Sequence, residues 1–334
     1  MRPTYLLTAT ASILALAGAY AAGPAKSRAG VPVARSLVTS EIEDSTKTGA
    51  VGPGATGPTV VRAQILLDRA RFSPGEIDGV YGDDLGIAVK GYQENPGLKP
   101  TGTIDAEMWR LLDSDAGPLL ATYTITQADE KGPFLPLPAD VQDKAKMKWL
   151  GFENPEEGLG ERFHSAPKVL AELNSGKKLD TAGEQISVPN LRRAVVRLAL
   201  RVVVSKSKRT VIAYGAGDKE LAQYPATIGD SHDPLPIGQW TITGVVHYPW
   251  YNYGPEHFWN SDPKQAKAVL PPGPNNPAGA AWIGLSKEHY GIHGTPDPGH
   301  VRHGVSAGCI RITNWDVDSL SRMVRRGTPV VLEE

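Results

Sequence analysis

The residues with the clearest chemical potential are His293 and Cys309, which stand 16 positions apart near the end of the chain. They lie in the segments 290–295 and 306–311, separated by a loop rich in Pro and Gly. A loop of this length can fold back and bring an imidazole within hydrogen-bond reach of a thiol. The imidazole then takes the thiol proton, and the sulfur attacks a carbonyl carbon. The spacing therefore predicts nucleophilic acyl transfer.

Two neighbouring residues suit the same chemistry. Gly308 has no side chain, so it leaves the sulfur approachable and lets backbone N–H groups beside Cys309 turn toward a developing oxyanion. Arg311 follows two residues later, on the same face if the segment is a strand, and a guanidinium can bind a carboxylate through two hydrogen bonds. The pattern thus adds an oxyanion site and a carboxylate-binding group to the predicted nucleophile and base.

Cys309 is the only cysteine of the chain. Residues 1–21 are typical of a secretory signal peptide, because Arg2 precedes a mostly apolar stretch that ends in the small-residue site at 19–21. An uncleaved membrane anchor is the alternative, although the apolar run is shorter than the roughly 20 residues that a span needs. Exported proteins normally pair their thiols, so a single cysteine needs a reason. Either it is a buried small apolar residue or it is catalytic.

A metal site is the main chemical alternative. Imidazole and thiolate groups bind zinc, and five of them fall within 21 residues. These are His289, His293, His300, His303 and Cys309. No Cys-x-x-Cys or His-Glu-x-x-His motif accompanies them, so we expect no bound metal and no cofactor. His300 and His303 are expected at the surface of a loop, and His289 is expected to pack beside the site.

The strands needed to position these residues are predicted in the C-terminal part of the chain. Apolar residues alternate with other residues over 198–204, and a turn separates this run from the apolar segment 210–214, as in a β-hairpin. Further short runs predict strands at 224–228, 239–245, 281–285, 290–293 and 328–332. Residues 196–334 are therefore predicted to form a mostly β domain.

The segments around His293 and Cys309 resemble the catalytic signature of the L,D-transpeptidase family, the YkuD-type domain. That family carries His-Gly-Thr followed, after a loop, by Ser-x-Gly-Cys-Ile-Arg, and the resemblance covers about residues 196–334. It implies a cysteine enzyme that attacks the third-residue carbonyl of a peptidoglycan stem tetrapeptide and expels the terminal D-alanine. The acyl group then passes to an amine, which belongs to another stem peptide or to an acceptor protein.

Carried over residue by residue, the resemblance makes Cys309 the nucleophile and His293 the base that returns its proton to the leaving group. The carbonyl of Gly294 would orient the imidazole, and Gly308 and Cys309 would supply backbone donors to the oxyanion. The residues expected to bind substrate are Arg311, Ser306, Tyr290 and Trp282. Ala307 stands where many members carry His, so no second imidazole is expected beside the thiol.

Residues 58–115 are predicted to form a three-helix module, with Asp105 as the N-cap of its third helix. The succession of a helix, Pro-Gly-x-Ile-Asp-Gly and Tyr-Gly resembles a small peptidoglycan-binding domain. Residues 133–190 show helix, helix and short strand, and resemble a LysM-type carbohydrate-binding repeat. A spacer domain is the alternative for that segment. His164 is expected to pack or to lie at the surface rather than to bind a ligand.

Two segments are predicted from their Pro and Gly content. Residues 22–57 lack apolar periodicity, so they are expected to be a flexible linker. Residues 248–277 are too long and too rich in Pro for a simple connection, so they are expected to form a lid over the active cleft.

Composition limits the remaining choices. A chain of 334 residues with 35 basic and 36 acidic residues has a net charge of −1, which gives no support to binding of nucleic acid. We expect a multidomain α+β protein of the periplasm or cell envelope, without a stable membrane span. Its expected function is a peptidoglycan L,D-transpeptidase. A non-catalytic peptidoglycan-binding scaffold and an L,D-carboxypeptidase that uses water as acceptor are the alternatives.

Overall fold

The computed structural model describes residues 37–95, 97–115, 117–192, 196–229, 234–255, 266–302 and 308–334. These residues belong to one compact unit. The predicted signal peptide, the first part of the predicted linker, and Ser306, Ala307 and His303 of the predicted site region lie outside the described residues. Among the described residues, no helix has both the length and the apolar composition needed to cross a membrane.

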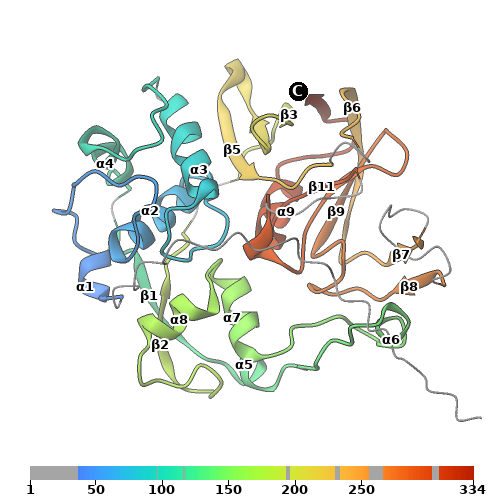
Figure 1. The fold of residues 1–334 in the computed structure, drawn as a ribbon, viewed down its shortest axis with the longest axis horizontal. Helices are drawn as coiled ribbons and strands as arrows, with labels where there is room; N and C mark the ends of the chain where they lie inside the picture. The colour runs from blue at the N-terminus through green and yellow to red at the C-terminus, as the bar shows by residue number, and fades with distance from the viewer. Residues whose placement is uncertain are drawn as a thin grey trace, which may run out of the picture. The chain divides into compact units, whose positions relative to one another are not determined.

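The N-terminal part of the described chain is helical (Figure 1). Its helices are α1 (Thr39–Ile42), α2 (Pro58–Arg69), α3 (Asp83–Glu94) and α4 (Ala106–Leu112). Their apolar faces share one core, in which Ile65, Leu85 and Trp109 are almost completely buried. Asp105 caps α4, because its carboxylate accepts a hydrogen bond from the Met108 backbone N–H at 2.9 Å. The three predicted helices and this cap are confirmed.

The prediction of a flexible linker was wrong for residues 37–57. Ile42 is fully buried, and Leu37 and Val51 are nearly so, in the core of the helical module. Val51 also exchanges two backbone hydrogen bonds with Ile104, at 2.9 and 2.8 Å. Isolated apolar residues in a Gly- and Pro-rich segment carry no periodicity, but each one can still fill a gap between helices that form elsewhere.

The middle part of the chain is a two-stranded sheet with four helices between its strands in sequence. Strand β1 (Leu120–Thr124) pairs antiparallel with β2 (Gln185–Pro189), and α7 (Pro155–Arg162) and α8 (Pro167–Leu173) lie between them in sequence. Short helices α5 (Gln127–Lys131) and α6 (Val141–Lys144) precede α7. The unit therefore begins near residue 120, and the predicted start at 133 omitted its first strand. None of the five residues of that strand is fully buried, so its sequence has no clear apolar alternation.

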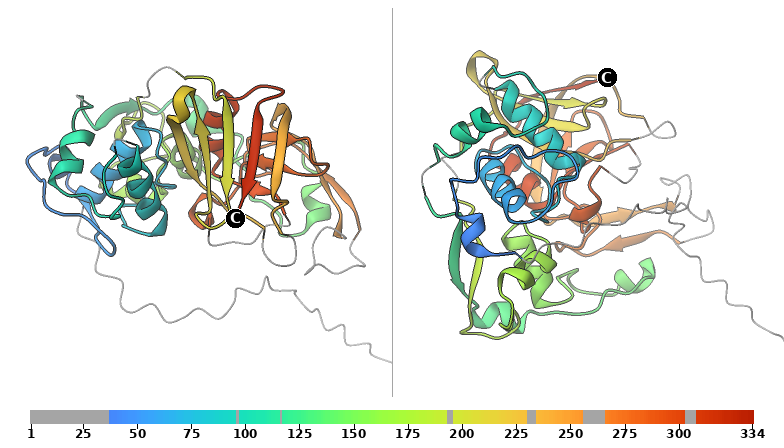
Figure 2. Two further views of the ribbon diagram at one scale, coloured as in Figure 1. Left: turned by 90° about the horizontal axis from the view of Figure 1, so that it is seen from above. Right: turned by 60° about the vertical axis from the view of Figure 1, so that its left-hand side comes forward.

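The C-terminal part contains an eight-stranded sheet in the order β11-β10-β9-β6-β12-β3-β4-β5 (Figures 1 and 2). Its strands are β3 (Arg201–Ser205), β4 (Thr210–Tyr214), β5 (Glu220–Pro225), β6 (Gly238–His247), β9 (Ala281–Leu285), β10 (Gly291–His293), β11 (Ile310–Arg311) and β12 (Pro329–Glu333). Helix α9 (Asn314–Ser321) packs on the sheet, with Val317 and Leu320 in the main apolar core. The predicted hairpin and the later strands are present, with bounds shifted by a few residues.

Part of the predicted lid forms a hairpin of β7 (Tyr251–Tyr253) and β8 (Ala268–Leu270). The chain that follows β8 is held against the middle part. Leu150 donates its backbone N–H to the Pro272 carbonyl at 2.8 Å, and Asn275 donates to the Leu150 carbonyl at 3.0 Å. Backbone hydrogen bonds therefore fix this end of the predicted lid.

The helical module is docked on the C-terminal sheet. Gln223 of β5 exchanges backbone hydrogen bonds with Arg71 and Ser73, at 2.8 and 2.9 Å. The Ser73 hydroxyl donates to the carboxylate of Asp316 in α9 at 2.8 Å, and both side chains are buried. Buried hydrogen bonds across the junction hold these two parts together, because breaking them would leave polar groups unsatisfied.

Candidate active site

The strand register pairs the predicted base, His293, with Arg311, one of the residues predicted to bind substrate. In the parallel pair of β10 and β11, His293 is level with Arg311, and Ile292 is level with Ile310. Side chains alternate along a strand, and level residues of a parallel pair point to the same face. Both isoleucines are fully buried in the core, so His293 and Arg311 lie on the opposite face. Cys309 lies immediately before β11, two residues before Arg311.

His293 is held by its Nδ1 atom. It is 6% exposed, and Nδ1 lies 2.7 Å from the carbonyl oxygen of Gly294. A carbonyl can only accept, so Nδ1 carries the proton and Nε2 keeps a free lone pair. Burial, followed by the charge of Arg311, lowers the pKa of His293 to about 3. The imidazole is therefore neutral at neutral pH and can accept a proton through Nε2.

Cys309 is partly buried and carries the only thiol. Its Sγ atom lies 3.7 Å from the carbonyl oxygen of His289. Burial raises the pKa of Cys309, while a hydrogen bond with the Gly291 backbone and the charge of Arg311 act in the opposite direction. At neutral pH the thiol of Cys309 and the imidazole of His293 are therefore both neutral. Such a pair requires the proton to move when the sulfur attacks, which is general base catalysis.

The turn before the thiol requires a glycine. Gly308 has a φ of 82°, a conformation that residues with a side chain rarely adopt. A Cβ atom there would also lie 3.0 Å from the ring of Tyr290. Tyr290 therefore covers the turn that presents Cys309, and the predicted substrate-binding tyrosine lies beside the predicted nucleophile.

Sequence reasoning missed Asn314, which packs closely against Gly294, the residue whose carbonyl holds His293. Asn314 is 3% exposed, and its side chain accepts from the Ala280 N–H at 2.8 Å and donates to the Pro274 carbonyl at 3.1 Å. A Cβ atom on Gly294 would lie 2.1 Å from Asn314 Oδ1, so the two residues are closely packed. An asparagine at the first residue of a helix is common, and no motif distinguished this one.

Two of the other histidines of the metal alternative, His289 and His300, belong to the described residues, and both side chains are exposed. The prediction that His289 packs beside the site was wrong for its side chain, which is 82% exposed and lies 3.5 Å from Glu288. His300 is 74% exposed and lies 2.8 Å from Asp297, in the exposed position that was predicted. Among the described residues, no three His, Cys, Asp or Glu side chains are grouped so that they could hold a metal ion.

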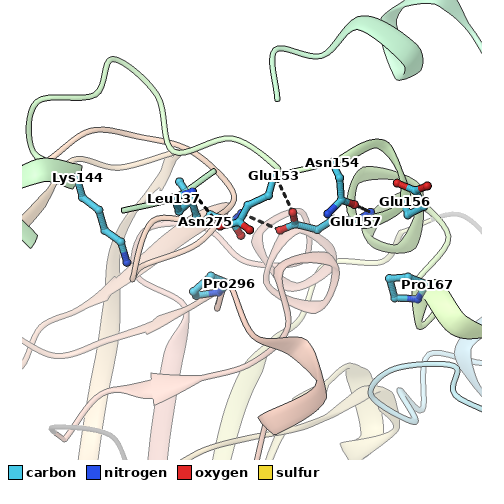
Figure 3. Close-up of a pocket in the computed structure, with 9 residues that line it drawn as sticks. All are labelled: Leu137, Lys144, Glu153, Asn154, Glu156, Glu157, Pro167, Asn275 and Pro296. Atoms are coloured by element: carbon cyan, nitrogen blue, oxygen red, sulfur yellow. Dashed lines mark hydrogen bonds between the residues drawn. The ribbon is translucent and has the colours of Figure 1, made fainter. Parts of the chain in front are cut away.

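A cavity of about 660 Å³ lies away from the predicted catalytic residues (Figure 3). It is lined by Leu137, Lys144, Glu153, Asn154, Glu156, Glu157, Pro167, Asn275 and Pro296. The Asn275 side chain donates to Glu157 at 2.7 Å, and Asn154 accepts from the Glu157 backbone at 2.8 Å. This network ties the chain after β8 to helix α7, so we assign it a structural role.

Comparison with known proteins identifies the class. Residues 199–332 match the family model described as the L,D-transpeptidase catalytic domain, YkuD, and residues 56–112 match the model described as "Putative peptidoglycan binding domain". The chain is 31% identical over 176 residues to the "Putative L,D-transpeptidase YkuD" of Bacillus licheniformis, which covers 52% of this chain and 90% of that protein. The Bacillus subtilis protein of the same description is 30% identical over 152 residues, or 46% of this chain and 76% of the relative.

The chain therefore belongs to the L,D-transpeptidase family. It is an enzyme of multidomain α+β architecture, with a helical peptidoglycan-binding region and a mostly β catalytic domain. A crystal structure of an L,D-transpeptidase from Xylanimonas cellulosilytica aligns at 14% identity over 85% of this chain and 97% of the other, with a TM-score of 0.38. That TM-score is too low to add to the assignment.

Proposed function

We propose that Cys309 forms an acyl-enzyme with peptidoglycan stem tetrapeptides and that His293 transfers the protons. The Cys309 sulfur attacks the carbonyl carbon of the third residue while its proton moves to His293 Nε2. The peptide bond to the terminal D-alanine breaks, and the proton passes to the leaving amine. An acceptor amine then attacks the thioester, gives a proton to His293, and the thiol is restored.

One observation carries this proposal. Across β10 and β11 His293 pairs with Arg311, which follows Cys309 by two residues, and the Gly294 carbonyl leaves Nε2 as the basic atom; both observations support proton transfer between the thiol and the imidazole. The partly exposed sulfur remains accessible to a substrate. We assign Gly308 and the Cys309 N–H to the oxyanion, and Arg311, Ser306, Tyr290 and Trp282 to substrate binding.

We further propose that the reaction takes place in the periplasm and serves remodelling of the cell wall. The helical module would bind peptidoglycan, and the middle unit, with its LysM-like order of helices and strand, would bind glycan. Because the helical module is docked on the catalytic sheet rather than freely tethered, bound wall would be presented to Cys309 in a limited range of orientations.

The test is the mass of the protein after incubation with a carbapenem-type β-lactam. The wild type should gain one adduct, and Cys309→Ala should gain none while keeping its circular dichroism spectrum. With tetrapeptide as substrate, the variant should release no D-alanine. An adduct on the folded variant would reject Cys309 as the nucleophile.

The acceptor is tested separately, by mass spectrometry of muropeptides incubated with the enzyme. Cross-linked dimers identify a diaminopimelate amine as acceptor, which is the outcome we expect. Conversion of tetrapeptide to tripeptide without dimers would instead identify water and a carboxypeptidase.

A further inference from the structure

The indole of Trp282 lies flat on two glycines of the catalytic sheet. Gly284 of β9 is level with Gly291 of β10, and Trp282 is level with His293. A Cβ atom on Gly291 would lie 2.5 Å from two carbons of the Trp282 ring. One on Gly284 would lie 3.4 Å from the Trp282 Nε1 atom. The indole therefore occupies space that any other residue at position 291 would fill.

This placement brings the indole against the catalytic imidazole. The rings of Trp282 and His293 are stacked, with centroids 5.4 Å apart and planes inclined by 17°. The imidazole edge is held independently by the Gly294 carbonyl, at 2.7 Å from Nδ1. One contact fixes the ring by its face and the other by its edge, so together they define both its position and its rotation.

We propose that Trp282 is a positioning residue for His293: its indole, seated on Gly284 and Gly291, holds the imidazole with Nε2 directed toward the thiol. This inference rests on the proposed role of His293 as the base. It assigns Trp282 a role that is independent of substrate contact, and it explains the glycine at position 291, whereas Gly284 is required chiefly by Thr243, whose Oγ1 would lie 2.7 Å from a Cβ atom there.

The surroundings of His293 identify what else acts on it. From β11, the ionisable groups are Arg311 and Cys309, and β9 carries none. Helix α9 contributes Asp316, which accepts a hydrogen bond from Ser73. Burial is the main cause of the low pKa of His293, and a stacked indole that excludes water from one ring face is consistent with that cause.

The test compares two substitutions that should both break the stacking of the indole on the imidazole. Trp282→Ala removes the indole, and Gly291→Ala displaces it. Each should slow acylation of Cys309 by a carbapenem-type β-lactam about 10- to 100-fold, as expected when a catalytic group loses its alignment. Each should also raise the pKa of His293, measured by NMR with histidine-selective labelling. Trp282→Phe should recover most of the rate, because it restores an aromatic face.

Gly244→Ala is the matched control. Gly244 of β6 is level with Gly284, but a Cβ atom there would meet nothing within 4 Å. This variant should acylate at the wild-type rate. Thermal unfolding of each variant checks that it is folded, and Trp282→Phe keeps the test decisive if Gly291→Ala does not fold.

Two results would overturn the inference. One is that Trp282→Ala weakens only the KM for tetrapeptide, with the His293 pKa and the acylation rate unchanged, as for a substrate contact. The other is that folded Gly291→Ala behaves like the wild type. A failure of the proposed function would appear in a different variant, because His293→Ala would then acylate at the wild-type rate.

Discussion

Within the described part of the chain, two histidines stack on a tryptophan, and they differ in the partner of Nδ1. The His164 ring stacks on Trp315 with centroids 5.0 Å apart, and its Nδ1 lies 2.9 Å from Asp68, a fully buried carboxylate. The His293 ring stacks on Trp282, and its Nδ1 lies 2.7 Å from a backbone carbonyl. A carboxylate can form an ion pair with imidazolium, whereas a neutral carbonyl in a buried site favours neutral imidazole.

The surroundings of the two rings correspond to different tasks. His164 belongs to the middle unit, Asp68 to α2 of the helical module and Trp315 to α9 of the catalytic domain, so one side chain links three parts of the chain. Its backbone carbonyl also accepts from the Ile77 N–H at 2.8 Å. An imidazole bound in this way stabilises a junction. An imidazole whose Nδ1 is held by a carbonyl keeps Nε2 as a basic atom that can transfer a proton.

The largest expected difference is in catalysis. His293→Ala should slow acyl-enzyme formation by at least about 100-fold, since it removes the general base, and should leave the fold intact. His164→Ala should change the same rate by less than about twofold. The measurement is the rate of adduct formation with a carbapenem-type β-lactam. Equal losses of rate in the two variants would mean that the junction, rather than the base, controls the reaction.

The second prediction concerns stability, to which His164 should contribute although it contributes little to catalysis. His164→Ala should lower the free energy of unfolding by about 2 kcal/mol, because it removes a hydrogen bond and an ion-pair partner from a buried carboxylate. Urea denaturation measures this change. His289→Ala is the matched control: its side chain is 82% exposed, and its loss should change stability by less than about 0.5 kcal/mol. If the two variants are equally stable, His164 does not hold the junction.

These two histidines also show what the sequence could and could not predict. The apolar pattern predicted a strand that ends at His293, which β10 confirms, whereas the pairing of this imidazole with the thiol of Cys309 stays a prediction. His164 was expected to pack or to lie at the surface rather than to bind a ligand, and it packs, but its partner Asp68 is 96 positions away. Contacts between distant parts depend on docking, which leaves no periodic signal in the sequence.

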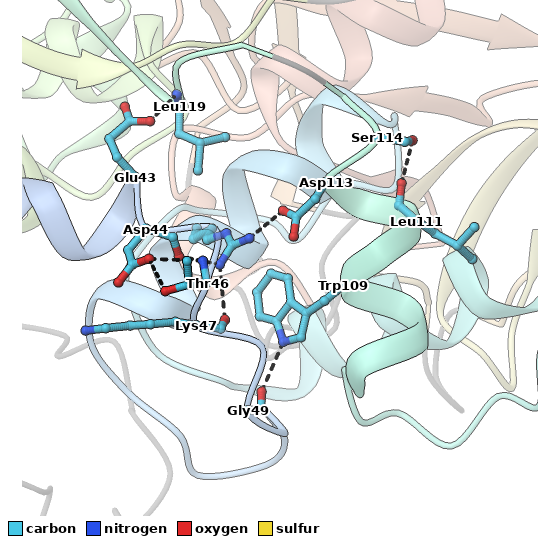
Figure 4. Close-up of polar contacts among 11 residues, drawn as sticks. Glu43, Asp44, Thr46, Lys47, Gly49, Trp109, Leu111, Asp113, Ser114 and Leu119 are labelled. Carbon is cyan, nitrogen blue, oxygen red and sulfur yellow. Dashed lines mark hydrogen bonds and ion pairs between the residues drawn. The ribbon is translucent and has the colours of Figure 1, made fainter.

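The dependence on packing between distant parts of the chain also explains the other contacts that the sequence did not predict. Trp109 donates its indole N–H to the Gly49 carbonyl at 3.0 Å, inside a segment whose composition indicated a linker (Figure 4). Gly291 was included in the sequence analysis only as part of the segment 290–295. Its contact with the indole of Trp282 depends on the strand register, which only the structure gives. Asn314 lies within hydrogen-bond reach of Ala280 only after α9 has packed on the sheet. Local patterns predicted elements and chemistry, whereas close packing required the structure.

The smallest expected effect is that of pH on acylation. Because burial and Arg311 lower the pKa of His293 to about 3, the imidazole is a competent base throughout the range from pH 5.5 to 8. Because burial raises the pKa of Cys309 above its ordinary value, the thiol stays protonated over that range. The concentration of the reactive neutral pair is then constant, so the acylation rate should vary by less than about twofold. An inflection near pH 6.5 would instead show that His293 titrates like an exposed histidine, and it would contradict the contrast drawn between the two stacked rings.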